Sequence, residues 1–554
     1  MLRIQLSVLD WVILASYFMV VLGIGFVARL SIKTDVDFFL SGRSLPAWIT
    51  GLAFMAANLG ALEILGQSAN GAQYGVAAVH YYWIGAVPAM VFLGLVMMPF
   101  YYGAKVRSVP EYLRLRFNDA THAFNAGTFA VATVLLSGVN LFALALILHL
   151  LIGWSIPTAI LIAAAIVLVY ITLGGLTSAI YNEVLQFFVI VAALLPLTLV
   201  ALHSIGGIHG IEQRVKHFQA LGSNGLHAWR GLGIHHVTNP LGSDWIGVVF
   251  GLGFVISFGY WTTNFAEVQR ALSARNLSAA RRTPLIGAFP KTFIPLIITL
   301  PGLIAVLLVH GLGVGKAVGV QYNTAIPHLI ATFLPEGMLG LAVTGLMAAF
   351  MAGVAANVTA FNTVVTYDLI QAYFAKDRDE RFYLRAGRLV TIAGIVVSVG
   401  TAFIAEGYSN MMNYIQQLFS IFNAPLFTTF IVAMFWKRAT AWGGFFSLVA
   451  GTVAAYTTNR LNAYHVIFHF GSQLAASFWQ SIAAFIVGTV VLVVVSLVTK
   501  PKPVEEIRGL VWGLTRKEER EENADPRDKL WWRSPVLLGA VLVAMLIVLN
   551  ILFA

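Results

Sequence analysis

The chain has 554 residues, of which 59% are apolar and only 10% are charged. Soluble globular proteins contain roughly 25% charged residues, so this chain has too few polar groups to cover its surface in water, and a large soluble protein is excluded. The sequence contains no cysteine, which excludes disulfides and thiolate metal sites.

Apolar stretches near the ~20 residues that a helix needs to cross a bilayer recur along nearly the whole chain. The sequence therefore predicts an all-α polytopic membrane protein with fourteen transmembrane helices, several of which are long enough to tilt or to extend beyond the bilayer. The predicted spans are residues 10–28, 45–66, 76–101, 122–151, 155–172, 183–206, 244–264, 286–310, 337–371, 386–405, 411–436, 440–457, 478–499 and 534–553.

The basic residues predict the orientation of these spans. If the N-terminus is outside and the spans alternate, most of the 34 lysines and arginines fall in inside loops, such as those with Arg29, Arg270 and Lys437. This asymmetry follows the positive-inside rule. The net charge of +10 is therefore a topology signal and does not indicate nucleic-acid binding. The predicted location is the cytoplasmic (plasma) membrane, with a multi-pass chain and the N-terminus outside.

Residues 1–554 are interpreted as a single transmembrane domain with two long loops. Loop 207–243 falls outside and holds several histidines, but their spacing does not match a metal site, so a solvated extracellular loop is expected. Loop 500–533 carries charges of alternating sign and is predicted to be a charged cytoplasmic connector before the last helix.

Two predicted spans are interrupted by polar residues at membrane depth. The second reads GLAFMAANLGALEILGQ, with Asn58, Gly60 and Glu63 in mid-run, and the seventh ends in a polar cluster that closes on Asn264. A broken helix is tolerated in a membrane only where it lines a cavity or is buried in protein. Two such helices, five spans apart, indicate a five-plus-five inverted repeat with a binding site near the midplane. Ordinary hydrogen bonding between helices is the alternative.

Four further polar residues are candidates, each with a simpler alternative. Glu183 could be an interfacial carboxylate stabilised by a helix N-terminus, and Lys291 could extend toward the membrane surface. Gln416 could serve helix packing, and Tyr82 could belong to an aromatic belt at the interface.

Six motifs along the chain belong together. They are DFFLSGRSLP (37–46), AANLG (56–60), RSVPEYLRLRF (107–117), GGLTSAIYNEVLQ (174–186), QRALSARN (269–276) and FWKRATAWGGFFSLVAG (435–451). In these motifs the chain resembles the sodium/solute symporter family, and its sodium/glucose (sodium/galactose) branch in particular. The resemblance covers nearly the whole length and implies fourteen helices with a ten-helix inverted-repeat core, the LeuT-like fold.

The resemblance implies roles for several residues. Asn58 and Gln416 stand where the family's sugar transporters bind the sugar, Lys291 matches a lysine that borders it, and Tyr260 matches the aromatic that stacks on the sugar and closes the inner gate. Ser257, one turn earlier, matches a polar wall position. A stacked aromatic ring with amide and ammonium groups suits a polyhydroxylated ligand, because the face of a sugar is apolar and its rim is polar.

Two positions depart from the sugar carriers. Tyr82 stands where those carriers have a glutamate, and Glu63 stands where they have glutamine or histidine. Compared with the sugar carriers, this chain is thus expected to have its carboxylate on the opposite side of the pocket. The identity of the solute therefore stays open.

The family's sodium site departs further. The resemblance places sodium between backbone carbonyls, here those of Ala56 and Leu59, and hydroxyls of the eighth core helix. The hydroxyl positions hold Ala349, Ala352 and Gly353 in this sequence. Because a hard cation needs several oxygen ligands, sodium binding there is expected to be weak.

Three explanations for the coupling stay open. Sodium is held by other residues such as Asn357 or Thr359, a proton is the coupling ion with Glu63 as its carrier, or transport is uncoupled. Glu183 replaces the family's aspartate at the start of the sixth span and is an ion-coupling candidate. On family grounds a coupling cation is favoured, with sodium ahead of the proton.

The expected function is secondary active, cation-coupled symport of a small neutral polar solute, in particular a sugar, by alternating access. No arginine lies in the middle of a predicted span, where it could bind a carboxylate substrate. The sequence also has no nucleophile–base pair or metal motif that would indicate an enzyme. No cofactor is expected apart from sodium as a possible coupling ion, and the expected partners are the small-molecule solute and the lipid bilayer. The alternatives are a carrier of an amino acid, osmolyte or carboxylate, and a sensor built on a transporter fold. The oligomeric state is not predicted.

Overall fold

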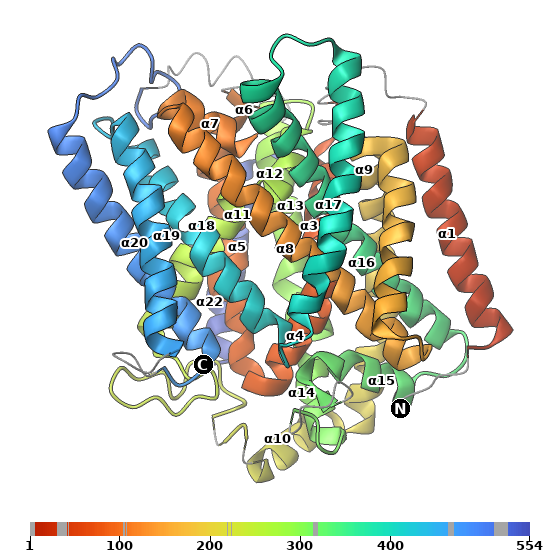
Figure 1. The fold of residues 1–554 in the computed structure, drawn as a ribbon. Helices are drawn as coiled ribbons and strands as arrows, with labels where there is room; N and C mark the ends of the chain where they lie inside the picture. The colour runs from red at the N-terminus through yellow and green to blue at the C-terminus, as the bar shows by residue number, and fades with distance from the viewer. Residues whose placement is uncertain are drawn as a thin grey trace.

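The computed structural model describes residues 6–29, 41, 44–103, 106, 108–218, 220–222, 224–313, 320–463, 470–514 and 530–554. Two of the predicted loops lie partly outside these described ranges. Most of the inside loop that follows α1 (Val8–Arg29), and residues 515–529 of the predicted loop 500–533, lie outside these ranges. Over the described ranges the chain is a bundle of helices (Figure 1), with two isolated bridges that pair Leu45 with Ala274 and Leu232 with Val237.

The first half of the bundle runs from α1 to the segment before the seventh predicted span. Its further elements are α3 (Ala47–Asn58), α4 (Ala61–Tyr74), η2 (Gly75–Val79), η3 (Tyr81–Ala86), α5 (Val87–Phe92), η4 (Leu93–Met97), α6 (Met98–Gly103), α7 (Val109–Arg116), α8 (Asp119–Leu151), α9 (Ile156–Ser204) and α10 (Gly207–His217).

The second half begins at the seventh predicted span. Its elements are η5 (Gly247–Ser257), α11 (Phe258–Thr263), α12 (Phe265–Leu272), α13 (Leu277–Ile297), α14 (Thr299–Leu308), η7 (Tyr322–Thr324), α15 (Ala325–Phe333), α16 (Met338–Thr363), η8 (Val364–Phe374), α17 (Glu380–Ala405), α18 (Met411–Phe435), α19 (Ala441–Ala463), α20 (Gln473–Val498), η10 (Trp531–Arg533) and α22 (Pro535–Leu552).

Each predicted span falls largely on helical residues, but the fifth and sixth, predicted as separate spans, lie on one continuous helix, α9. In the described part of the chain, 10 helices are long and apolar enough to cross a membrane, and two bent pairs bring the number to 12. The other two predicted spans correspond to the shorter apolar piece Ile156–Leu168 at the start of α9, and to α19, which ends in a polar turn around Arg460.

The two interrupted spans are bent where the sequence predicts. Ala47–Asn58 and Leu62–Val79 meet at 56°, and Gly247–Thr263 and Phe265–Leu272 meet at 50°. At the second bend the Asn264 side chain accepts a hydrogen bond from the Ala266 N–H at 3.0 Å, so a polar residue both ends α11 and caps α12. At each bend the helix is interrupted, so the backbone N–H and C=O groups of the bend lie in the middle of the bundle.

The interior and the lipid-facing side of the bundle are distinct. In the apolar spans of α8 and α16, 89% of the residues are buried inside the protein, against 28% in those of α1 and α20 and 22% in that of α22. Exposed apolar helices need lipid around them, because water would not solvate them. α8 and α16 pack against each other and against the α3/α4 pair, so the first bend lies at the centre of the protein.

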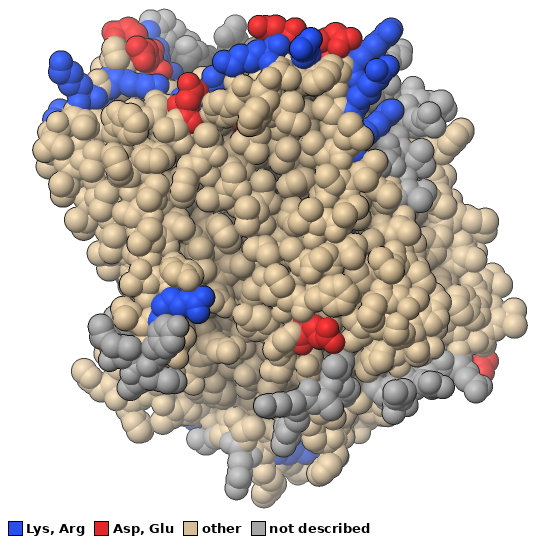
Figure 2. All heavy atoms as spheres, in the orientation of Figure 1, with Lys and Arg blue, Asp and Glu red and all other residues tan. Residues whose placement is uncertain are grey.

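The segments that the basic residues assign to the inside meet at one end of the bundle. The Arg116 guanidinium donates to the carbonyls of Ala439 at 3.0 Å and Trp436 at 3.1 Å, and the Tyr112 hydroxyl donates to the carbonyl of Leu510 at 2.6 Å. Most of the visible Lys and Arg side chains gather over this end (Figure 2). We refer to it as the basic face.

The segments assigned to the outside meet at the opposite end. The Trp229 indole donates to Asn550 at 3.0 Å, and the Ala228 N–H donates to the carbonyl of Phe553 at 3.0 Å. Loop 207–243 and the end of α22 therefore lie together, as alternating spans require.

Candidate functional site

A cavity lies where the two bent pairs approach each other. Its volume is about 90 Å³, less than the roughly 300–1,000 Å³ typical of small-molecule sites. The side chains come from both bends and from η3, α8, α13, α16 and α18. Its polar and aromatic lining consists of Asn58, Glu63, Gln67, Tyr81, Tyr82, Asn140, Ser257, Tyr260, Trp261, Glu267, Lys291, Asn357, Gln416 and Phe419.

Seven of the eight predicted substrate residues line this one cavity. They come from segments far apart in the sequence: Asn58, Glu63, Tyr82, Ser257, Tyr260, Lys291 and Gln416. Asn264 is the eighth, and it is not part of the lining, because its side chain caps α12 at the second bend. Tyr82 lies inward on η3, where it is 1% exposed, and is not part of an interfacial belt.

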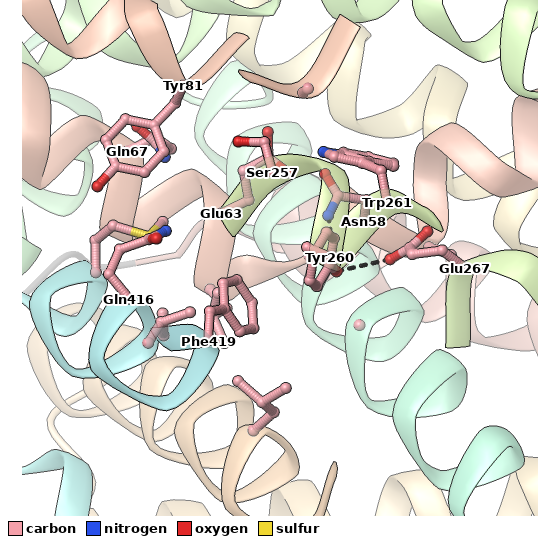
Figure 3. Close-up of a pocket in the computed structure, with 18 of the residues that line it drawn as sticks. Asn58, Glu63, Gln67, Tyr81, Ser257, Tyr260, Trp261, Glu267, Gln416 and Phe419 are labelled. Atoms are coloured by element: carbon pink, nitrogen blue, oxygen red, sulfur yellow. Dashed lines mark hydrogen bonds between the residues drawn. The ribbon is translucent and has the colours of Figure 1, made fainter. Parts of the chain in front are cut away.

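A continuous chain of polar contacts crosses the cavity wall. The Lys291 ammonium contacts both Glu63 oxygens, at 2.5 and 2.6 Å, and donates to the side-chain oxygen of Asn58. The Asn58 amide donates to the Tyr260 hydroxyl at 3.0 Å, and that hydroxyl donates to Glu267 Oε1 at 2.7 Å (Figure 3). These contacts connect both halves of each bent pair.

The Lys291 charge is fully engaged inside the protein. Lys291 is 1% exposed, and its ammonium lies 5.2 Å from the centre of the Tyr82 ring and 5.1 Å from the centre of the Trp261 ring. Aromatic faces attract cations, which adds to the attraction of Glu63. Lys291 therefore does not extend to the membrane surface, and its charge is balanced within the cavity wall.

Two side chains on α11 and α18 form an aromatic wall. The rings of Tyr260 and Phe419 lie 4.6 Å apart at 37°, and Trp261 lies edge-on to Tyr260 at 5.4 Å. Figure 3 shows Tyr260 and Phe419 side by side, with Gln416 one turn away on α18. Such a wall offers an apolar face beside polar groups.

Gln416 presents an open acceptor. Its Nε2 atom lies 3.4 Å from the Met412 sulfur, while Oε1 is buried and has no hydrogen-bond partner among the described residues. A buried amide oxygen without a partner costs roughly 1–3 kcal/mol, which a donor from a ligand or water would offset.

The residues that the sequence resemblance assigned to a sodium site pack closely. Ala56, Leu59, Ala349 and Ala352 are fully buried, and a side chain added at Gly60 would lie 3.1 Å from the Gly353 Cα. The first bend thus meets α16 directly, with no side-chain oxygen from Ala349, Ala352 or Gly353 between them.

Glu183 lies outside the cavity. Its carboxylate and the Arg270 guanidinium are both fully buried and form two contacts, NH2 to Oε1 at 2.5 Å and Nε to Oε2 at 3.2 Å. This ion pair joins α9 to α12, so Glu183 is not an interfacial carboxylate.

Sequence reasoning missed Glu267, whose side chain lines the cavity. The seventh span was predicted to end at residue 264, which left Glu267 in a loop. The helical period carries no signal for this residue, because the bend at Asn264 interrupts the helix between Tyr260 and Glu267. Phe419 could have been found, because it follows Gln416 by three on the single helix α18, and residues three apart share a helix face.

The comparisons with known proteins agree with this geometry. The family model "Sodium:solute symporter family" matches residues 38–451. The chain is 28% identical to sodium/glucose cotransporter 4 of Danio rerio, over 96% of this chain and 84% of that protein. It is 29% identical to a sodium/mannose cotransporter of Bos taurus, over 83% of this chain and 80% of the relative.

Solved structures support the fold. A Na⁺-coupled sialic acid symporter in a substrate-bound, outward-open state matches with a TM-score of 0.73 at 18% identity, over 90% of this chain and 99% of that chain. Mhp1, a nucleobase-cation-symport-1 family transporter, matches with a TM-score of 0.53 at 14% identity, over 88% and 97% of the two chains. These are LeuT-fold transporters, which confirms the predicted fold class. The relatives are transporters and not enzymes. The protein belongs to the sodium:solute symporter family.

Proposed function

We propose that this protein is a secondary active transporter that moves a small neutral polar solute, in particular a sugar, together with a cation. The observation that supports this most is the single cavity between the two bent helix pairs, which unites seven dispersed polar and aromatic residues. Broken helices at mid-membrane are the usual place of substrate and ion sites in transporters with inverted repeats.

The charges of the cavity favour a neutral solute. Lys291 is paired with Glu63, so its ammonium is not free to pair with a substrate carboxylate. None of the described lining residues is an arginine, the side chain best suited to bind a carboxylate through two parallel hydrogen bonds. A carboxylate substrate would therefore meet no unpaired cation there.

The uncharged groups suit the two surfaces of a sugar. Gln416 Oε1 is an open acceptor for a hydroxyl, while the rings of Tyr260 and Phe419 offer an apolar wall for the C–H face. The names of two relatives, a sodium/glucose and a sodium/mannose cotransporter, point to the same class of solute.

The proposed alternating-access cycle assigns a role to Gln416, Asn58 and Tyr260. The solute enters from the face opposite the basic face, which we assign to the outside, and binds between Gln416 and Asn58. Tyr260 then lies between the solute and α12, where it acts as the inner gate. Release requires the hydroxyl of Tyr260 to leave Asn58 or Glu267, because both contacts hold the gate in its present position.

A cation gradient supplies the driving force in this proposal. Sodium is the ion that the family's description names, and the carbonyls of Ala56 and Leu59 lie at the first bend, where the family's sodium ion would bind. The matching positions on α16 supply no side-chain oxygen, so a sodium ion would need ligands from elsewhere, such as Asn357.

The test is uptake by the purified protein in proteoliposomes. Labelled D-glucose, D-galactose and D-mannose, with an amino acid and a dicarboxylate for comparison, are offered with an inward sodium gradient, a potassium gradient or a proton gradient. We expect uptake of at least one hexose above protein-free vesicles. Uptake restricted to the amino acid or the dicarboxylate, or no uptake by any gradient, would contradict the proposal.

A further inference from the structure

Glu267 is a buried carboxylate with incomplete bonding. It is 1% exposed on α12, and Oε1 accepts one hydrogen bond, from Tyr260, while Oε2 is buried and has no partner among the described residues. A carboxylate removed from water without a compensating charge is costly, so it needs a cation or a proton.

The charged neighbours of Glu267 are already paired with other groups. Arg270 makes its two-point contact with Glu183, and its NH1 atom donates to the Ala266 carbonyl at 2.7 Å. Lys291 is held by Glu63 and Asn58. Neither cation lies within hydrogen-bonding distance of Glu267 in the described contacts.

The remaining elements around α12 add no compensating charge. α3 and α16, which pack against α12, contain no titratable side chain, and α11 contributes Tyr260. α13 also packs against α12; besides Lys291 it carries Arg281 and Arg282, which donate to the carbonyls of Gly94 and Ser278. On α6, the Tyr102 hydroxyl donates to the Ala274 carbonyl at 3.0 Å. Tyr101 on α6 is engaged through its hydroxyl with the carbonyl of Thr262 at 2.9 Å. Glu267 is therefore the one carboxylate in the described cavity lining that has no cationic partner.

The oxygen atoms around Glu267 suit a proton better than sodium. Sodium needs several oxygen ligands at once, but the Tyr260 hydroxyl is oriented as a donor toward Oε1, and the Ala266 carbonyl is occupied by Arg270. A proton needs only the free Oε2 atom. Glu63 differs in this respect, because both of its oxygens contact an ammonium group that balances its charge.

We propose that Glu267 is the proton-binding residue that couples transport to a proton gradient. This inference rests on the proposed function and names its coupling ion. The proton comes from water on the outside, binds Oε2 and makes the cavity wall electrically neutral when the solute is bound. It leaves to the inside when the gate opens, since α12 lies nearer to the basic face than α11 does (Figure 1).

Protonation acts on the gate through Tyr260. The ionised carboxylate accepts a strong hydrogen bond from the Tyr260 hydroxyl and fixes the ring against Phe419. A protonated Glu267 is a weaker acceptor and can itself donate, which frees the hydroxyl for Asn58 or for the solute. The charge of one buried group thereby controls the residue that separates the solute from the inside.

The test compares Glu267→Gln with wild type in proteoliposomes. The glutamine keeps the shape of the side chain but cannot bind a coupling proton. For wild type we expect the vesicles to accumulate the transported hexose about tenfold when the outside is one pH unit more acidic than the inside and one proton accompanies each solute. For Glu267→Gln we expect hexose counterflow to persist while this accumulation disappears. Glu267→Asp, which keeps a carboxylate, should retain part of it.

A matched control carries the same change on the surface. Glu212→Gln removes an exposed carboxylate of α10 and should accumulate the hexose like wild type. If Glu267→Gln still accumulates the hexose with a pH difference, or if wild type accumulates it only with sodium, the proton assignment is overturned while the transport function stands. If wild type shows no counterflow of any hexose, the function itself fails.

A second measurement does not depend on the solute. Infrared difference spectra of the wild-type protein between acidic and alkaline buffer should contain the C=O stretch of a protonated buried carboxyl. We expect Glu267→Gln to lose this band and Glu212→Gln to keep it. A wild-type spectrum without such a band, or a band unchanged by Glu267→Gln, would overturn the proposal.

Discussion

The buried ion pair between Glu183 and Arg270 allows a quantitative prediction of stability. Both side chains are fully buried, and their two contacts join α9 to α12. Glu183→Gln removes the negative charge but keeps the shape, and leaves the Arg270 guanidinium with the Ala266 carbonyl at 2.7 Å as its main acceptor. Arg270→Met leaves the Glu183 carboxylate without a donor among the described hydrogen bonds.

The magnitude follows from the desolvated charge that each variant leaves behind. Removing one partner of a buried pair costs about 3–5 kcal/mol of unfolding free energy, because the other charge stays buried and uncompensated. Replacing both partners by apolar groups removes that penalty. The double variant Glu183→Leu with Arg270→Met should therefore lose less stability than Glu183→Leu or Arg270→Met alone, which corresponds to a coupling energy of more than about 3 kcal/mol.

The assay is reversible unfolding in lipid–detergent micelles, with an exposed pair as control. Arg114 and Asp119 form an ion pair at 2.6 Å, but their side chains are 43% and 63% exposed. Removing either member should cost less than about 1 kcal/mol, because solvent screens exposed pairs. If Glu183→Gln costs no more than Arg114→Gln, or if the double variant loses as much as the two singles together, the reasoning about a buried pair is wrong.

Two further predictions concern the ion and the topology. Ala349→Ser with Ala352→Ser introduces two hydroxyls on α16, which packs against the first bend, and should make uptake more dependent on sodium, as measured by uptake at increasing sodium concentration. An unchanged dependence would show that α16 does not border an ion site. Because the chain has no cysteine, His235→Cys and Arg381→Cys give clean labelling sites in intact cells. We expect an impermeant maleimide to label His235→Cys from outside but not Arg381→Cys, and the reverse pattern would contradict the N-out orientation.

The sequence predicted the architecture well, because the architecture depends on signals that lie within single spans. Apolar length defines the helices, and both bends occur where Asn58–Gly60 and the cluster ending in Asn264 interrupt a span. The α19 segment is the weakest case, since its last turn is polar and its apolar length alone does not identify a span.

The site could be predicted only in part, because pairing depends on contacts between distant segments. Polarity identified Lys291 and Glu63 as candidates, but nothing in the sequence showed that they neutralise each other, as they are 228 residues apart. The same holds for Glu183 and Arg270, 87 residues apart. Glu267 was missed because it follows the second bend, where hydropathy had already ended the span.

Counterflow in proteoliposomes tests the central claim most directly, namely that the cavity between the bends binds the solute and carries it across. Vesicles loaded with an excess of the unlabelled hexose, without any ion gradient, should take up the labelled hexose transiently. Asn58→Ala and Gln416→Ala should abolish this overshoot while the protein still inserts, and Gln213→Ala, an exposed amide on α10, should leave it intact. An unchanged overshoot in both cavity variants would contradict the account.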